Sequence, residues 1–93
     1  MMNFSEAMEA LKEGKKVARK GWNGKGMFIF LTPESHVPYS KLKDHVQRHL
    51  ITHPESRVKI NAHIDMKAAD DSLVIGWLAS QTDMLAEDWE IVV

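Results

Sequence analysis

Two tryptophan-bearing segments hold the side chains of this 93-residue chain that are best suited to binding chemistry. Residues 19–27 surround one indole ring with basic and amide side chains, and residues 77–89 follow another ring with hydroxyl and carboxyl groups. Flat rings beside short hydrogen-bonding side chains suit the capture of a flat polar molecule such as a nucleobase. The candidate ligand contacts are Arg19, Trp22, Asn23, Lys25, Trp77, Ser80, Thr82 and Asp83.

Structural roles for the same residues stay open at this point. In a domain this small, tryptophans such as Trp22 and Trp77 are more often part of the core than a platform for a ligand. Ser80, Thr82 and Asp83 could equally cap a short helix. The two roles are compatible, because the N-terminus of a helix carries unpaired N–H groups and is itself a polar recognition site.

Three histidines recur at a spacing of four residues. On a helix, His45, His49 and His53 would share one face, and two such histidines can bind zinc. The residues between the first two histidines include no carboxylate, so the metalloprotease pattern is absent. A solvent-facing histidine stripe on a peripheral helix explains the spacing better, and we expect no metal site.

The residue types needed for covalent catalysis are not arranged in a recognisable way. The chain has no cysteine, and none of its serines stands in a nucleophile motif with a histidine base. Gly24 and Gly26 are too few for a glycine-rich phosphate loop. The sequence therefore predicts a binding protein that is not an enzyme and that needs no cofactor.

The composition is that of an ordinary small globular domain, with 44% hydrophobic and 27% charged residues. The net charge of −1 provides no field that would attract DNA. No apolar stretch approaches the roughly 18 residues of a membrane span. We expect a cytoplasmic protein without DNA or membrane partners. Because a core this small is marginal, we also expect it to form a homo-oligomer.

The first third of the chain predicts a helix followed by a hairpin. Asn3 can cap the helix, Glu6 occupies the capping-box position, and Gly14 can end the helix in a left-handed conformation. Strands are then expected over residues 15–20 and 27–31, around a loop at residues 21–24. Asn-Gly at residues 23–24 is the strongest short signal for a type I′ turn.

The remaining segments complete an α+β fold. Residues 32–39 contain two prolines and predict a loop, whereas residues 40–52 have a helical pattern. Residues 57–67 alternate cleanly between apolar and polar, which predicts one strand with a core face and an exposed face. A returning strand over residues 73–78, a helical turn over 80–87 and a last strand over 89–93 follow. We expect an antiparallel sheet of about five strands, an N-terminal helix and an inserted peripheral helix.

The segments at residues 3–7, 19–25 and 77–89 resemble a family of small phage and prophage proteins, the second type of Thoeris anti-defence protein. The resemblance covers about residues 1–32 and 60–93 of what we expect to be a single domain, residues 1–93. Residues 33–59 depart from the compact pattern of shorter relatives and are predicted to be an insertion.

The resemblance implies a protein that sequesters an immune signal without cleaving it. Members bind a cyclic ADP-ribose isomer, such as a glycocyclic ADP-ribose, and some bind cyclic di- or trinucleotides of the related CBASS defence. They are homotetramers with pockets between subunits, acting in the infected bacterial cell.

The resemblance also implies roles for the candidate residues. Trp22 and Trp77 would enclose the adenine, Asp83 and the other short polar side chains would bind ribose hydroxyls or base edges, and Arg19 and Lys25 would face the pyrophosphate. The alternative function is a protein–protein interaction module that inhibits a host factor through the exposed strand face.

Overall fold

The structure is a computed structural model that describes residues 1–50 and 52–93, and the chain forms two compact units. The first unit comprises Met1–Thr32 and His63–Val93, and the second comprises Pro33–Ala62. The first unit contains both tryptophan-bearing segments, so the candidate site is built from this unit alone.

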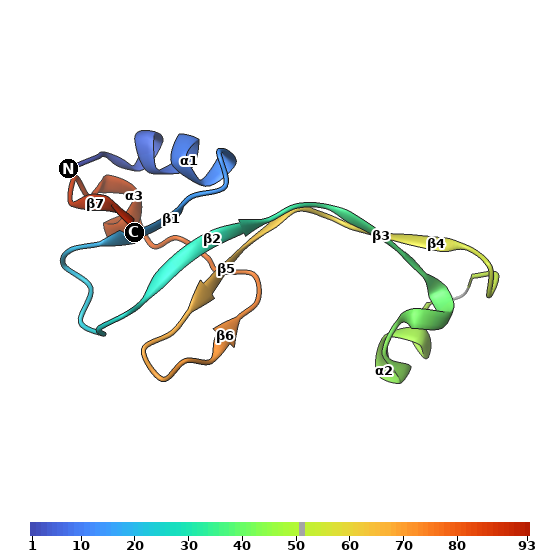
Figure 1. Ribbon diagram of the computed structural model, residues 1–93. Coiled ribbons are helices and arrows are strands. Elements are labelled where there is room, and N and C mark those ends of the chain that lie inside the picture. Colours follow the sequence, from blue (N-terminus) through green and yellow to red (C-terminus); the bar gives the residue numbers. More distant parts are fainter. Residues whose placement is uncertain (51) are drawn as a thin grey trace. The chain divides into compact units, whose positions relative to one another are not determined.

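The first unit is an antiparallel sheet with two helices, which confirms the predicted α+β class (Figure 1). The strand order is β6-β5-β2-β1-β7, so β1 and β7 are neighbours although they lie at opposite ends of the chain. The elements are α1 (Phe4–Lys12), β1 (Lys16–Arg19), β2 (Phe28–Thr32), β5 (His63–Lys67), β6 (Leu73–Val74), α3 (Gln81–Leu85) and β7 (Trp89–Val92).

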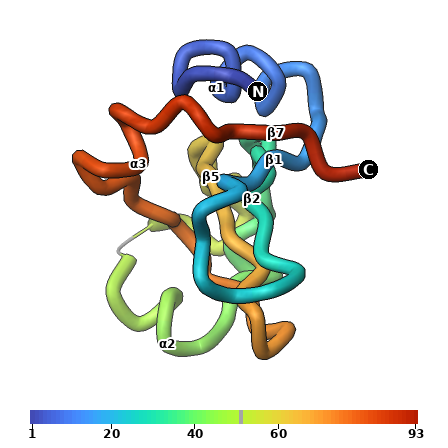
Figure 2. The backbone as a smooth tube through the Cα atoms, turned by 90° about the vertical axis from the view of Figure 1, so that its left-hand side faces the viewer, coloured from blue at the N-terminus to red at the C-terminus, as the bar shows by residue number. Residues whose placement is uncertain are grey.

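The first helix begins and ends as its sequence predicts. The Asn3 side chain accepts a hydrogen bond from the Glu6 backbone N–H, and the Glu6 side chain accepts one from the Asn3 N–H. Gly14 follows the helix with a φ of 87°, a left-handed conformation that glycine adopts without steric cost. In Figure 2, α1 runs across β7 and β1. Its buried face contributes Ala7 and Leu11 to the core.

The core lies between α1 and one face of the sheet. Val17 in β1 and Ile29 in β2 are paired across the ladder and are fully buried, together with Trp89 at the start of β7. These side chains fix the edge of the sheet where β1 and β7 meet. The candidate site is built at that edge.

The prediction of one continuous strand over residues 57–67 is wrong. Its first part is β4 (Arg57–Ile60), which pairs only with β3 (Ser35–Pro38), and its second part is β5 in the five-stranded sheet. Asn61 and Ala62 interrupt the strand, because the two halves have different pairing partners. Asp65, which the alternation assigns to the solvent face, is 3% exposed.

The second unit also departs from the pattern of its sequence. The segment at residues 32–39, predicted as a loop, contains β3, where Pro38 is tolerated at the end of a two-stranded sheet. The predicted helix over residues 40–52 is reduced to a 3₁₀ turn (Tyr39–Lys41) and α2 (Asp44–Gln47). Leu42 and Lys43 have extended backbone between them, and residue 51 lies outside the described residues.

One turn prediction and one strand prediction in the first unit are also wrong. Strands β1 and β2 pair as expected, but within the described chain the positive φ angle of their connection falls at Gly26 rather than at residues 23–24. Gly24 packs closely against the Ala69 side chain, since a Cβ at residue 24 would lie only 2.8 Å from it. The strand predicted over residues 73–78 is limited to β6, since Gly76 turns the chain with a φ of 80°.

Among the described residues, no helix is both long enough and apolar enough to span a membrane.

Candidate functional site

Three tryptophan rings gather beside the β1–β7 edge of the sheet. The ring centroid of Trp22 lies 5.4 Å from that of Trp89 and 6.2 Å from that of Trp77, both in edge-to-face geometry. Trp89 is fully buried, whereas Trp22 and Trp77 are only partly buried around it. Edge-to-face packing is a favourable arrangement of aromatic rings. The two outer indoles therefore pack on a fully buried core residue, while Trp22 and Trp77 themselves stay partly exposed.

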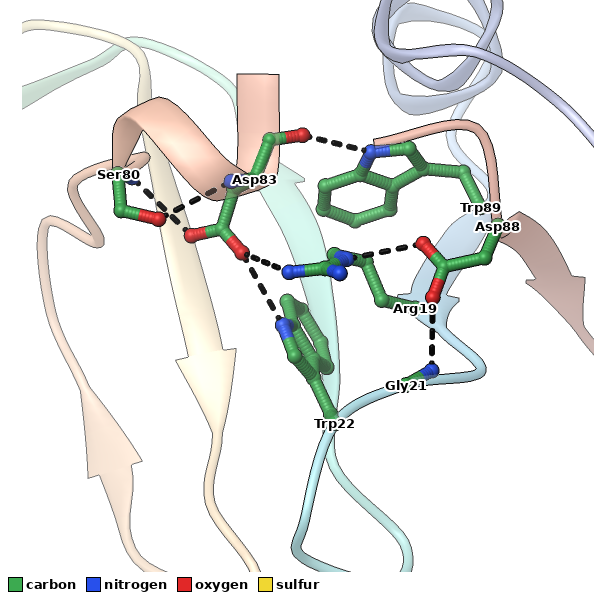
Figure 3. Close-up of polar contacts among 7 residues, drawn as sticks. All are labelled: Arg19, Gly21, Trp22, Ser80, Asp83, Asp88 and Trp89. Carbon is green, nitrogen blue, oxygen red and sulfur yellow. Dashed lines mark hydrogen bonds and ion pairs between the residues drawn. The ribbon is translucent and has the colours of Figure 1, made fainter. Parts of the chain in front are cut away.

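Asp83 lies at the centre of the polar half of this cluster (Figure 3). Its Oδ1 accepts hydrogen bonds from Arg19 Nη1 at 2.9 Å and from Trp22 Nε1 at 3.2 Å, and its Oδ2 accepts one from the Ser80 backbone N–H. Burial opposes ionisation of the carboxyl, but these hydrogen bonds outweigh burial and hold the pKa of Asp83 below its ordinary value. Asp83 is therefore a carboxylate whose bonds are already made within the protein.

Arg19 joins Asp83 to a second carboxylate, Asp88. Arg19 Nε donates to Asp88 Oδ1 at 2.9 Å, and Asp88 Oδ2 accepts the backbone N–H of Gly21 at 2.8 Å (Figure 3). The Arg19 side chain is 15% exposed. The hydrogen bond from Arg19 is the main reason that the pKa of Asp88 is lowered, and the two carboxylates together raise the pKa of Arg19. We call this group of Arg19, Asp83 and Asp88 the carboxylate bridge.

The short helix α3 presents its N-terminus next to the rings. Ser80 is the N-cap: its Oγ accepts the Asp83 backbone N–H, and Asp83 completes the capping box by accepting the Ser80 N–H. The capping interpretation of Ser80 and Asp83 is thus confirmed, and it does not exclude contact with a ligand. Ser80 and Thr82 are exposed.

Comparison with known proteins identifies the family that this sequence is similar to. Residues 2–92 match the family described as the Thoeris anti-defense 2-like domain. A protein named Thoeris anti-defense 2, from Bacillus phage SP01, is 41% identical over 91 residues, which cover 98% of this chain and 94% of that protein. The chain belongs to the Thoeris anti-defense 2-like family.

Membership of the Thoeris anti-defense 2-like family supports a phage anti-defence role. The matched range includes the second unit, Pro33–Ala62. The expectation that residues 33–59 are an insertion stays a prediction.

In this Thoeris anti-defense 2-like protein, most of the predicted site residues come together and two stand apart. Asn23 and Lys25 lie exposed on the connection between β1 and β2. The residues that meet around the rings and the carboxylate bridge are Arg19, Trp22, Trp77, Ser80 and Asp83, with Thr82 on the exposed side of α3.

Sequence reasoning missed two contacts, that of Asp88 with Arg19 and that of His63 with Asp65. Asp88 directly precedes β7, and Arg19 ends the neighbouring β1, so a prediction of this strand pair would have brought the two charges together. His63 Nδ1 lies 2.7 Å from Asp65 Oδ1, and Asp65 also accepts hydrogen bonds from Thr32 Oγ1 and the Gly76 N–H.

The histidine stripe predicted at residues 45, 49 and 53 does not form. Helix α2 ends at Gln47, so only His45 lies within it. The part of the chain that the structure describes contains no group of three or more side chains placed to hold a metal ion.

Proposed function

We propose that this protein binds and sequesters a cyclic ADP-ribose isomer, without cleaving it, and so prevents an immune signal from activating its effector in the infected bacterium. Glycocyclic ADP-ribose is the expected form, and cyclic di- or trinucleotides of the CBASS type are a second class. Family membership supports the anti-defence part of this proposal. The site supports the ligand class.

The observation that carries the proposal is the pair of partly exposed indoles beside the N-terminus of α3. Trp22 and Trp77 come from opposite ends of the chain, yet their centroids are 6.2 Å apart. Aromatic platforms of this kind stack on nucleobases whatever the base identity. Hydroxyl groups on Ser80 and Thr82 lie on the adjoining helix turn, where they suit ribose hydroxyls and base edges.

The ionisation of the acidic residues favours binding over acid–base chemistry. Four carboxyl groups have clearly shifted pKa values, and each pKa is lowered: Asp65, Asp70, Asp83 and Asp88. A carboxyl group is most effective as a general acid or base when its pKa lies near the working pH. At the site, the lowered pKa values of Asp83 and Asp88 are those of charges fixed by hydrogen bonds, and we propose that these carboxylates hold the site in place rather than transfer protons.

The bonds of the carboxylate bridge refine the roles of the candidate residues. Arg19 Nη1 and Asp83 Oδ1 are bonded to each other, so these two atoms are not free for a pyrophosphate or a diol unless their contact breaks. We therefore place them behind the indoles, as support. Asn23 and Lys25 remain the proposed contacts on the loop, with Lys25 as the charge for the pyrophosphate.

We further propose that the protein assembles as a homotetramer. Several large apolar side chains near the site are exposed, including Leu78 at 89% and Leu85 at 78%. Exposed apolar patches mark protein–protein interfaces, and interfaces between identical subunits are more apolar than the rest of the surface. A second copy that covers α3 would bury them and enclose the indoles.

Recovery of the ligand tests the proposal against its alternatives. The protein is mixed with purified cyclic ADP-ribose isomer in a calorimeter, then denatured by heat, and the released nucleotide is analysed by mass spectrometry. The proposal expects saturable binding and intact ligand. Fragments of the ligand would identify an enzyme. Absence of binding would favour the alternative function, a module that inhibits a host factor by binding to it. That alternative was based on one exposed strand face over residues 57–67, which the structure divides between two sheets.

A further inference from the structure

Asp88 is a charged residue at the site for which neither the sequence nor the proposed function supplies a role. It lies in the turn between α3 and β7, and it bonds to two different parts of the opposite end of the chain. One carboxylate oxygen accepts a hydrogen bond from Arg19 Nε, and the other accepts one from the Gly21 backbone N–H. The Asp88 backbone C=O also accepts the Lys20 N–H. Asp88 therefore fixes the first residues of the loop that carries Trp22.

The carboxylate bridge connects Asp88 to the Trp22 indole. Arg19 is held by Asp88 on one side and donates to Asp83 on the other, and the same Asp83 Oδ1 accepts the Trp22 indole N–H. A planar guanidinium that bonds two carboxylates can adopt few orientations. The Trp22 ring is thus held at both ends, by its indole nitrogen and by the backbone beside Gly21.

Gly21 provides independent support for this arrangement. A Cβ at this position would lie 2.8 Å from Asp88 Oδ2, closer than real Cβ contacts allow. The φ angle of Gly21 is not in the left-handed region, so glycine is needed here for close approach rather than for backbone conformation. The absence of a side chain at Gly21 is what allows the carboxylate to reach the backbone N–H.

We propose that Asp88 is a positioning residue that, through Arg19 and Asp83, fixes the Trp22 indole in the orientation that receives the ligand. Asp88 makes no contact with the ligand in this proposal. Its effect on binding rests on the proposed function, whereas its effect on Trp22 does not. A ring fixed beforehand binds more tightly, because less side-chain freedom is lost on binding.

Two variants break the same contact in different ways. Asp88→Asn replaces one carboxylate oxygen by an NH₂ group, so either Arg19 or Gly21 loses its acceptor. Gly21→Ala keeps every polar group but pushes the carboxylate away from the backbone. Asp70→Asn is the matched control, since this carboxylate bonds only within its own turn, to Ser72.

The first readout needs no ligand. In ¹⁵N–¹H spectra, the Trp22 indole signal, assigned with Trp22→Phe, should shift and exchange faster with solvent in both Asp88→Asn and Gly21→Ala. It should stay in place in Asp70→Asn. The Trp89 indole N–H, which bonds the Asp83 backbone C=O, reports whether the core is intact. An unchanged Trp22 signal in either folded variant would overturn the proposal, and Gly21→Ala decides it if Asp88→Asn does not fold.

The second readout is the affinity for a cyclic ADP-ribose isomer. Both variants should bind it about five- to tenfold more weakly, the lower part of the range for losing one stacked ring. If Trp22 moves while the affinity stays at the wild-type value, Asp88 is structural only and the proposal fails. If wild type itself does not bind, the proposed function fails, and the spectra still decide whether Asp88 positions the ring.

Discussion

At the scale of single residues, the site is defined by which groups are exposed and which are already bonded. Trp22 and Trp77 share Trp89 as a common support, but only Trp89 is fully buried. Arg19 and Asp83, which the sequence offers as ligand contacts, bond to each other. The structure therefore shows which of the candidate groups already have partners within the protein.

The role of Trp77 leads to the first prediction. Trp77→Ala should weaken binding of a cyclic ADP-ribose isomer by about ten- to a hundredfold, because stacking on one ring contributes about 1–3 kcal/mol per base. Calorimetric titration measures the change, and circular dichroism checks that the variant is folded. Unchanged affinity in a folded variant would show that Trp77 does not contact the ligand. Loss of the fold would show that Trp77 is a core residue.

The second prediction concerns Asp83, whose carboxylate is bonded within the protein. The side chain is 12% exposed and accepts three hydrogen bonds. In Asp83→Asn, an NH₂ group must face one of those donors, so the free energy of unfolding should fall by about 2 kcal/mol. Thermal unfolding should show a melting temperature lower by about 10 °C. A melting temperature equal to that of wild type would show that the carboxylate bridge is not stabilising.

At the scale of elements, caps and junctions decide where helices end and strands meet. Asp65 joins three elements: it lies in β5, and it accepts hydrogen bonds from Thr32 in β2 and from Gly76 after β6. Burial opposes its ionisation, but these bonds and His63 outweigh burial and lower its pKa. The junction is therefore more stable when Asp65 is ionised.

The pH dependence of unfolding tests this junction. A carboxyl whose pKa is lower in the folded than in the unfolded state stabilises fully above its unfolded pKa of about 3.9, and this contribution is lost as the pH falls through the folded pKa. The melting temperature should therefore decrease from about pH 5 downwards. In Asp65→Asn this decrease should be smaller. A variant that follows the wild-type pH curve in parallel would show that Asp65 does not contribute to it.

Gly14 gives a prediction for the end of α1. Its φ of 87° is a conformation that other residues adopt only with strain, and a Cβ there would meet no atom within 4 Å. Gly14→Ala should thus lower the free energy of unfolding by about 1 kcal/mol through backbone strain alone. Chemical denaturation measures it, and Gly14→Asn should cost less because asparagine tolerates this conformation. Equal stability of Gly14→Ala and wild type would contradict the assigned backbone.

At the scale of the whole molecule, the first unit has a small core and several exposed apolar side chains. The predicted homotetramer should give a light-scattering mass close to four times the 10.6 kDa of the chain. Leu78→Asp with Leu85→Asp should reduce that mass, because charges would replace the apolar contacts of an interface. A mass near that of one chain for wild type at micromolar concentration would refute the tetramer and any pocket between subunits.

The sequence by itself determined the elements whose signals are local. The cap at Asn3, the glycine after α1, the cap at Ser80 and the α+β class all follow from residues within a few positions of one another. The apolar pattern of residues 57–67 was also local, and it failed because pairing partners divide that segment between two sheets.

Only the tertiary structure decided the site. The pairing of β1 with β7 brings Arg19 beside Asp88 and Asp83, although 64 or more positions separate Arg19 from them along the chain. A sequence shows each charge and each ring but not its partner, since hydrogen bonds act over a few ångströms in space. The role of Arg19 and Asp83 as mutual partners, and of Asp88 as their anchor, therefore came from the fold.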